Sequence, residues 1–107
     1  MTISALHEYK NNHHTIVGSL MLGTPCEKLT TEAVVRESSP EQVTLLFSTE
    51  NTSDICAQVI TKVPFEIEFN ASKGAKINAM LNSAPVKLDL SSANTDDITK
   101  FKLDMAR

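Results

Sequence analysis

Three histidines near the amino terminus could bind a metal: His7, His13 and His14, with Glu8 beside the first. Histidine is the commonest protein ligand for transition metals. In an extended strand, however, the adjacent His13 and His14 point to opposite sides, so they cannot both reach one ion. We therefore predict solvent-exposed histidines in a flexible segment and no metal-ligating residues.

Several carboxylates are spaced as catalytic or calcium-binding groups can be. Glu66 and Glu68 share one face of an extended strand, about 7 Å apart. Such a pair could serve a hydrolase, but it is more typical of the wet side of an amphipathic strand. Loop carboxylates could bind calcium, although a solvated loop is the simpler interpretation. These loop residues are Glu50, Asp54, Asp96 and Asp97.

Catalytic motifs are missing from the sequence. No serine lies in a G-x-S-x-G elbow, and there is no HExxH motif, no EF-hand pattern and no phosphate-binding glycine loop. The chain has only three glycines. We therefore expect a protein that is not an enzyme, with no catalytic residues and no cofactor. An enzyme on a β scaffold is the less favoured alternative.

Cys26 and Cys56 are the only cysteines. An even number permits a disulfide, and closing a loop of about thirty residues would stabilise the fold by roughly 3–4 kcal/mol. The CxxC spacing of metal and redox sites is absent. We predict a disulfide, which indicates an oxidising compartment, and two buried thiols are the alternative.

Composition narrows the class of protein further. Hydrophobic residues make up 41% and charged residues 21% of the chain, and the net charge is −3, as in soluble globular proteins. The sequence contains no run of basic residues, so we do not expect nucleic-acid binding. No apolar run approaches the ~20 residues that span a bilayer. Residues 1–8 lack the features of a signal peptide. We expect an extracytoplasmic protein (periplasmic, secreted or surface-attached) whose export signal is absent from this chain; a cytosolic protein is the alternative.

Alternating apolar and polar residues predict β-strands along most of the chain. The clearest run is Val63–Phe69, which places its apolar residues on one face and its two glutamates on the other. Turn-forming residues separate this run from others of the same kind. The other predicted strands are 15–22, 29–36, 43–47, 55–60, 75–81 and 86–90. The run 55–60 is apolar on both faces, as in a central strand.

Three local features refine the predicted sheet. Pro64 lacks a ladder donor, which indicates an edge or a bend where 56–62 and 65–69 pair in different sheets. The segment 81–86 is typical of a hairpin tip, with Asn82 at positive φ. Gln58 lies two residues after a cysteine, on the same face of a strand, and is expected to be buried with its amide hydrogen-bonded.

The length of 107 residues fits one domain. We expect residues 1–14 to form a loose amino-terminal arm and residues 15–107 a single β-sandwich domain. Alternation within 98–105 favours a last strand. A helix is the alternative, capped by Thr95 with Asp96 and Asp97 in its first turn.

The chain resembles the immunoglobulin-like β-sandwich superfold through its seven or so short strands, its cysteine pair and the 81–86 hairpin. Thr24-Pro25-Cys26 and Cys56-Ala57-Gln58-Val59 are similar to segments of small, uncharacterised prokaryotic exported domains. The chain lacks the tryptophan that packs on the immunoglobulin disulfide, and its only tyrosine is far from a tyrosine-corner position. The resemblance implies an antiparallel sandwich and no particular function.

We expect an exported, non-enzymatic binding or accessory module for an unknown protein or surface ligand. Sandwiches present loops at their ends, where recognition usually occurs. The candidate recognition loops are Asn51, Thr52, Ser53, Asp54 and Asn94, Thr95, Asp96, Asp97. One alternative is a small protein protease inhibitor that inserts such a loop into an active site. Another is a structural segment of a larger surface protein.

Overall fold

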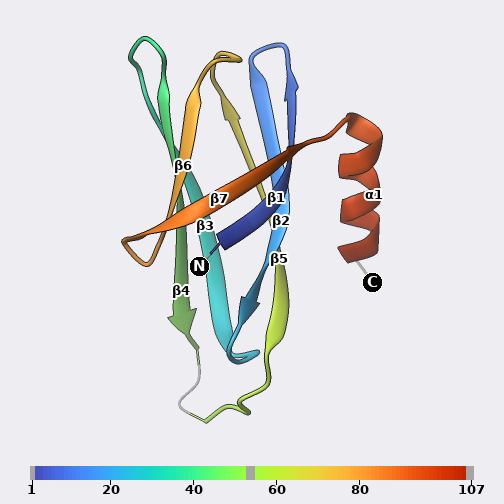
Figure 1. Cartoon of the computed structure of the whole chain (residues 1–107). Coiled ribbons are helices and arrows are strands. Elements are labelled where there is room, and N and C mark those ends of the chain that lie inside the picture. Colours follow the sequence, from blue (N-terminus) through green and yellow to red (C-terminus); the bar gives the residue numbers. More distant parts are fainter. Residues whose placement is uncertain (1, 53–54, 106–107) are drawn as a thin grey trace.

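The computed structural model describes residues 2–52 and 55–105, and strands make up most of it (Figure 1). The predicted all-β class is confirmed. The strands of this part of the chain are β1 (Thr2–Lys10), β2 (His13–Leu22), β3 (Glu27–Arg36), β4 (Gln42–Asn51), β5 (Thr61–Asn70), β6 (Lys76–Leu81) and β7 (Ala84–Ser92). The helix α1 (Thr95–Met105) follows them.

The seven strands form one sheet in the order β3-β4-β6-β7-β1-β2-β5. β7 is the joint of this sheet, because Ala84–Val86 pair with β6 while Lys87–Ser92 pair with β1. Figure 1 shows β7 crossing diagonally in front of the other strands. The end strands β3 and β5 also come close to each other, so the sheet nearly closes around a core.

Two strand pairs are parallel, which corrects the expectation of a purely antiparallel fold. β1 runs parallel to β7, and β4 runs parallel to β6. Parallel neighbours need a long crossover connection between them. The chain provides one in each case, because β5 and its flanking segments separate β4 from β6, and five strands separate β1 from β7.

The strand that changes partners is not the one predicted. β5 is continuous, and Thr61–Asn70 all pair with β2, with Pro64 opposite Ser19. The prediction of an edge position for Pro64 is confirmed, because β5 is the last strand of the sheet. A proline is tolerated there because an edge strand leaves half of its N–H groups outside the ladder. Because β5 is continuous, the predicted bend at Pro64 is wrong. The strand that pairs with both halves of the sheet is β7.

The core lies between the two halves of the sheet. β5 places Phe65, Ile67 and Phe69 inward and leaves both glutamates exposed, as the alternation predicts. The ring of Phe65 meets the ring of Phe47 from β4 edge to face, with 4.9 Å between the centroids. Aromatic pairs in this geometry add to the stabilisation that burial alone provides. The contact therefore joins the two halves of the sheet across the core.

The first strand replaces the predicted loose arm. Residues 2–10 form β1, which lies between β7 and β2, and its Ile3 and Ala5 are buried. The polar residues of the second half of β1 conceal the strand in the sequence. Pairing with β2 along Ala5–Lys10, and with β7 as far as His7, satisfies backbone groups of the strand, and this outweighs the weak hydrophobic pattern.

Residues 55–60 do not form the predicted central strand. They have no regular secondary structure, and Ile55, Val59 and Ile60 are exposed. Gln58 is exposed as well, so the prediction of a buried amide is wrong. The segment leaves the sheet because the cysteine at position 56 bonds to the turn before β3 instead of continuing a strand.

The last element is a helix and not the favoured strand. The backbone N–H of Asp97 donates to Asn94 Oδ1 at 2.8 Å, and the N–H of Asn94 donates to Asp97 Oδ2 at 3.2 Å. This reciprocal cap begins α1. Ile98 is buried and Phe101 is half-buried. Their spacing places both side chains on one face of a helix, and this outweighs the two-residue alternation that favours a strand. Asn94, not Thr95, is the cap.

The predicted hairpin tip is confirmed. Asn82 and Ser83 have φ angles of 50° and 69°, and they join β6 to β7. Two consecutive residues at positive φ are typical of the tight turns that match the twist of a hairpin.

Gly18 allows the core to close over β2. A Cβ at this position would lie 2.8 Å from Cζ of Phe65 and 3.0 Å from the carbonyl oxygen of Ser4. Both distances are shorter than ordinary van der Waals contact. A side chain at position 18 would therefore displace the aromatic ring or the β1 backbone.

We predict that Gly18→Ala destabilises the protein by about 1–3 kcal/mol through overpacking. The free energy of unfolding from chemical denaturation measures this. Gly23→Ala is the matched control, because nothing lies within 4 Å of a Cβ at that position. Equal stability of the two variants would show that the ring and the strand move apart without strain.

Candidate functional site

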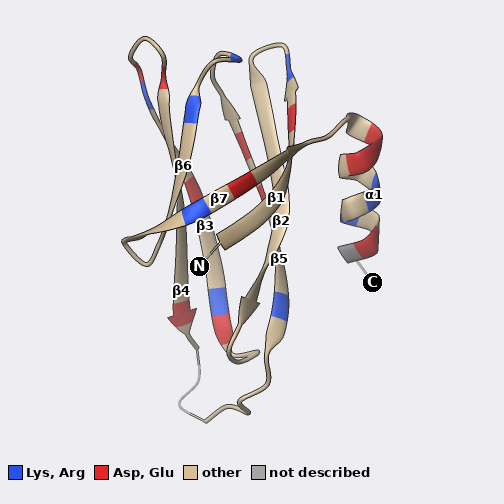
Figure 2. Ribbon diagram, in the orientation of Figure 1, with Lys and Arg blue, Asp and Glu red and all other residues tan. Residues whose placement is uncertain are grey.

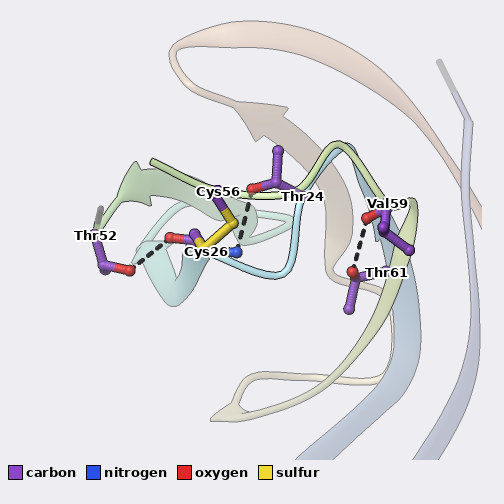
Figure 3. Close-up of a disulfide and its surroundings, with 6 residues drawn as sticks. All are labelled: Thr24, Cys26, Thr52, Cys56, Val59 and Thr61. Carbon is purple, nitrogen blue, oxygen red and sulfur yellow. Dashed lines mark hydrogen bonds between the residues drawn. A yellow bond between two sulfur atoms is a disulfide. The ribbon is translucent and has the colours of Figure 1, made fainter. Parts of the chain in front are cut away.

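The predicted disulfide between Cys26 and Cys56 is present, with 6.2 Å between the Cα atoms (Figure 3). It joins the turn after β2 to the segment before β5. Two hydrogen bonds lie beside the disulfide. The N–H (2.9 Å) and the hydroxyl (2.6 Å) of Thr52 both donate to the carbonyl oxygen of Cys26. Covalent and hydrogen bonds therefore hold the chain after β4 against the turn between β2 and β3.

The disulfide holds a segment that we call the stapled loop, residues 55–60. It carries no charged residue, and Figure 2 shows it uncoloured at one end of the molecule. Ile55 is 91% exposed, Ile60 69% and Val59 58%. Met21 of β2, 57% exposed, lies at the same end, because Thr61 next to Ile60 pairs with Leu22. We call this end the disulfide end.

Most of the large exposed hydrophobic side chains of the described residues lie at the disulfide end. The described residues include six large exposed hydrophobic side chains, and four of them are the ones just named. Single exposed hydrophobic residues are ordinary, but a group of them marks an interaction surface. Sequence patterns concealed this group, because aliphatic residues on both faces of a short run also describe a buried strand.

The first predicted recognition loop lies next to the stapled loop. Asn51 ends β4, and Thr52 is exposed with its hydroxyl bonded to the carbonyl of Cys26. Ser53 and Asp54 lie outside the described residues. The described half of this loop thus belongs to the tie that fixes the disulfide end.

The second predicted loop lies on another part of the molecule, and the structure does not bring the two loops together (Figure 1). Asn94 and Asp97 form the cap of α1, and the hydroxyl of Thr95 donates to the carboxylate of Glu8 on β1. Asp96 is exposed in the first turn of the helix. These polar groups start the helix and attach it to the sheet.

An open hollow of about 310 Å³ separates α1 from the outer face of the sheet. Its floor includes Leu6 and Val17, Phe101 of the helix forms one wall, and Ser4, Ser19 and Ser91 contribute hydroxyl groups. It contains no titratable side chain, so it offers apolar surface and hydroxyls and no acid–base chemistry.

The histidines correct the prediction of an exposed, flexible group. His13 and His14 do point to opposite sides of β2, as predicted. His13 lies outside, 2.9 Å from Asn70 Oδ1 and 3.3 Å from Glu68 Oε1. His14 is only 1% exposed, and its ring stacks on the ring of Phe69 at 4.7 Å. The sequence pattern does not predict the burial of His14, because this burial depends on β1, which pairs beside β2, and on Phe69 of β5.

His7 and His14, which we call the histidine pair, share a hydrogen bond. Nε2 of His7 lies 2.8 Å from Nδ1 of His14. Nε2 of His14 lies 3.2 Å from the carbonyl oxygen of Ala71 and 3.0 Å from that of Ser72. Tyr9 packs edge-on against His14 at 4.9 Å. The pair therefore connects β1 and β2 to the turn after β5.

Three pKa shifts accompany these contacts. Burial, and then positive charge on His14, lower the pKa of His7 below 6.5. The hydrogen bond that His13 donates to Asn70 Oδ1, and then the one that it donates to Glu68 Oε1, raise the pKa of His13. The hydroxyl and the N–H of Ser72 donate to the carboxylate of Glu41 at 2.6 and 2.9 Å and lower its pKa.

No group of three or more histidine, cysteine or acidic side chains is placed to hold a metal ion within residues 2–52 and 55–105. The same part of the chain has no helix both long and apolar enough to cross a membrane. Comparison of the chain with protein-family models, with curated proteins and with solved structures finds no match. The function is therefore inferred from the residues and contacts described above.

We predict that acidification from pH 7.5 to 5.5 lowers the free energy of unfolding through His7. Its pKa is lower in the folded than in the unfolded chain, so its contribution is complete above pH 6.5 and is lost as the pH falls through the lowered pKa. His7→Gln should flatten this dependence in denaturation curves recorded across the range.

His13→Gln is the matched control. The pKa of His13 is raised, so its contribution is present below pH 6.5 and is lost as the pH rises through the raised pKa. Its removal should therefore make the loss of stability on acidification steeper. A His7→Gln variant with the same pH dependence as the wild type would contradict the prediction.

Proposed function

We propose that this chain is an extracytoplasmic, non-enzymatic binding module that presents the stapled loop to a partner protein. The observation that carries the proposal is the exposure of Met21, Ile55, Val59 and Ile60 beside a disulfide. Water contact with these side chains is unfavourable, and a partner that covers them removes it. The partner surface is therefore expected to be apolar.

The energetics favour the stapled loop as the contact. Full burial of an aliphatic side chain contributes roughly 1.5–3 kcal/mol. Ordering a loop on binding opposes association, and a loop that is already held loses less freedom. The disulfide and the two bonds from Thr52 hold the chain at this end before a partner arrives. Burial of the aliphatic side chains and the prior ordering of the loop both favour binding.

The disulfide supports the proposed location. Disulfides persist in oxidising surroundings, and cytosolic reductants keep most thiols reduced. A bond between Cys26 and Cys56 is thus compatible with a periplasmic, secreted or surface-attached protein. The same bond also holds the proposed contact surface in place. The proposed binding would therefore require surroundings in which the disulfide persists.

A protease inhibitor is the second candidate. The feature that favours it is the irregular, exposed backbone of residues 57–60, tethered at one end by a disulfide. An inhibitory loop has to be accessible and held in place in this way. Incubation with serine and cysteine proteases decides: inhibition supports this candidate, and cleavage of the loop without inhibition excludes it.

We predict that a photoreactive amino acid at Gln58 crosslinks the chain to one discrete protein in the extracytoplasmic fraction of its source. The double variant Val59→Ser, Ile60→Ser should lose this adduct, because the apolar contact is gone, and should keep its melting temperature. Adducts are measured by gel mobility and mass.

Two controls accompany the crosslink. A photoreactive residue at the exposed Lys87 on β7 should give no adduct, and Val34→Ser, at an exposed hydrophobic residue of β3, should leave the adduct from position 58 intact. No adduct from position 58, or an equal adduct from position 87, contradicts the proposed function.

We predict that the double variant Cys26→Ala, Cys56→Ala unfolds with a free energy lower by about 3–4 kcal/mol, the contribution expected for a closed loop of this length. Chemical denaturation measures the change. In the wild-type chain, thiol labelling of protein taken directly from its source should modify neither cysteine until a reductant is added. Labelling without reductant argues against the oxidising compartment.

A further inference from the structure

A chain of hydrogen bonds crosses the end of the molecule opposite the disulfide. It begins at His7 on β1, continues through His14 on β2 to the carbonyl of Ser72, and ends where Ser72 donates to Glu41. We call this the rim network. Figure 1 shows that the β1–β2 turn, the turn after β5 and the β3–β4 connection all lie at this end.

The proton positions in the rim network follow from its partners. Carbonyl oxygens only accept hydrogen bonds, so Nε2 of His14 must carry a proton. The facing atoms, Nε2 of His7 and Nδ1 of His14, then share one proton between them. His7 Nδ1 is the remaining nitrogen. With it unprotonated the histidine pair is neutral, and with it protonated the pair carries one positive charge.

A second positive charge is incompatible with this geometry. It requires a proton on both facing nitrogens, and two N–H groups cannot point at each other across 2.8 Å. Repulsion between two imidazolium rings acts in the same direction, more strongly where water is excluded. The first proton is thus accommodated, and the second breaks the bond.

Other titratable groups near the histidine pair do not change the number of protons that the pair can hold with its hydrogen bond intact. Tyr9 on β1 packs against His14. Glu41 before β4 accepts hydrogen bonds from Ser72 and also attracts positive charge on His14, but this attraction does not make room for two protons between the facing nitrogens. On the opposite face of β1 and β2 lie Glu8 and His13, and β7 contributes the uncharged Ser92 beside His7. The basic side chains of this end are exposed; they are Lys10, Arg36, Lys73 and Lys76.

We propose that the histidine pair is a pH-sensitive latch, which stays closed with one proton added and opens when the second proton separates His7 from His14. His14 is fully buried and held by two carbonyls, so the half-buried His7 is the ring that moves outward. Its departure exposes His14 and the carbonyls of the turn after β5 to water. The lowered pKa of His7 agrees with opening on the acid side of neutrality.

Amide hydrogen exchange, measured residue by residue between pH 7.5 and 5.0, tests the latch. Glu41 stays ionised in this range because its pKa lies below 4.5. After correction for the intrinsic exchange rate, the protection of the Ala71 and Ser72 amides should fall by about tenfold. Uptake of one proton changes the equilibrium between the closed and open forms by this factor over one pH unit. The amide of Thr52, bonded to Cys26 at the other end, should keep its protection.

His7→Gln is the decisive variant. Its amide can donate to Nδ1 of His14 through the NH2 group or, after rotation, accept from a protonated Nδ1 through its oxygen. No two N–H groups then have to face each other, so rim protection should no longer depend on pH. His13→Gln, at the exposed neighbour, should retain the fall. Unchanged protection in the wild type, or the same fall in His7→Gln, overturns the proposal.

Nitrogen NMR of the wild-type histidines gives a second measurement that needs no variant. At pH 7.5 the spectrum should show His14 protonated on Nε2 and accepting at Nδ1. Acidification should produce two separate protonation steps, and the coupling between the two rings should disappear at the second. A single step for both rings, or a coupling that persists after both rings are protonated, overturns the latch.

Discussion

The pairing of β7 with two different strands is the constraint on which the rest of the structure depends. Its first residues complete the half-sheet of β3, β4 and β6, and its later residues lie beside β1. Without this shared strand the two halves would meet only through side chains and the approach of β3 to β5. The aromatic contact between Phe47 of β4 and Phe65 of β5 requires the halves to be held at a fixed separation.

The two ends of this sheet are closed by different chemistry. A covalent bond and the contacts of Thr52 hold the disulfide end, and they are insensitive to protons. Hydrogen bonds between titratable side chains hold the other end. The first end is held by a bond that only reduction can break, whereas the proposed latch makes the second end depend on pH. The core cluster between them consists of hydrophobic residues.

Sequence reasoning succeeded where one local rule acts alone. The run Val63–Phe69 has strict alternation and one buried face, and Asn82 lies at a turn that needs positive φ. It failed where distant partners decide. The polar second half of β1 is a strand because it pairs with β2, and residues 55–60 are a loop because Cys56 bonds elsewhere.

The candidate sites follow the same division. The disulfide was predictable because the chain offers one possible pair of cysteines. The burial of His14 was not, because it depends on β1 and on carbonyls of a turn more than fifty residues away. The sequence favours a strand over a helix at 98–105, because the reciprocal cap of Asn94 and Asp97 depends on backbone geometry that the alternation of the following residues obscures.

The parallel pairing of β1 with β7 also sets an order on folding. Thr2 lies opposite Lys87, so β1 cannot complete its ladder before β7, which follows it after five other strands, is in place. Contacts between such distant residues slow folding, because a long loop must close before they form. The joining of the two halves of the sheet is therefore expected to be a late step in folding.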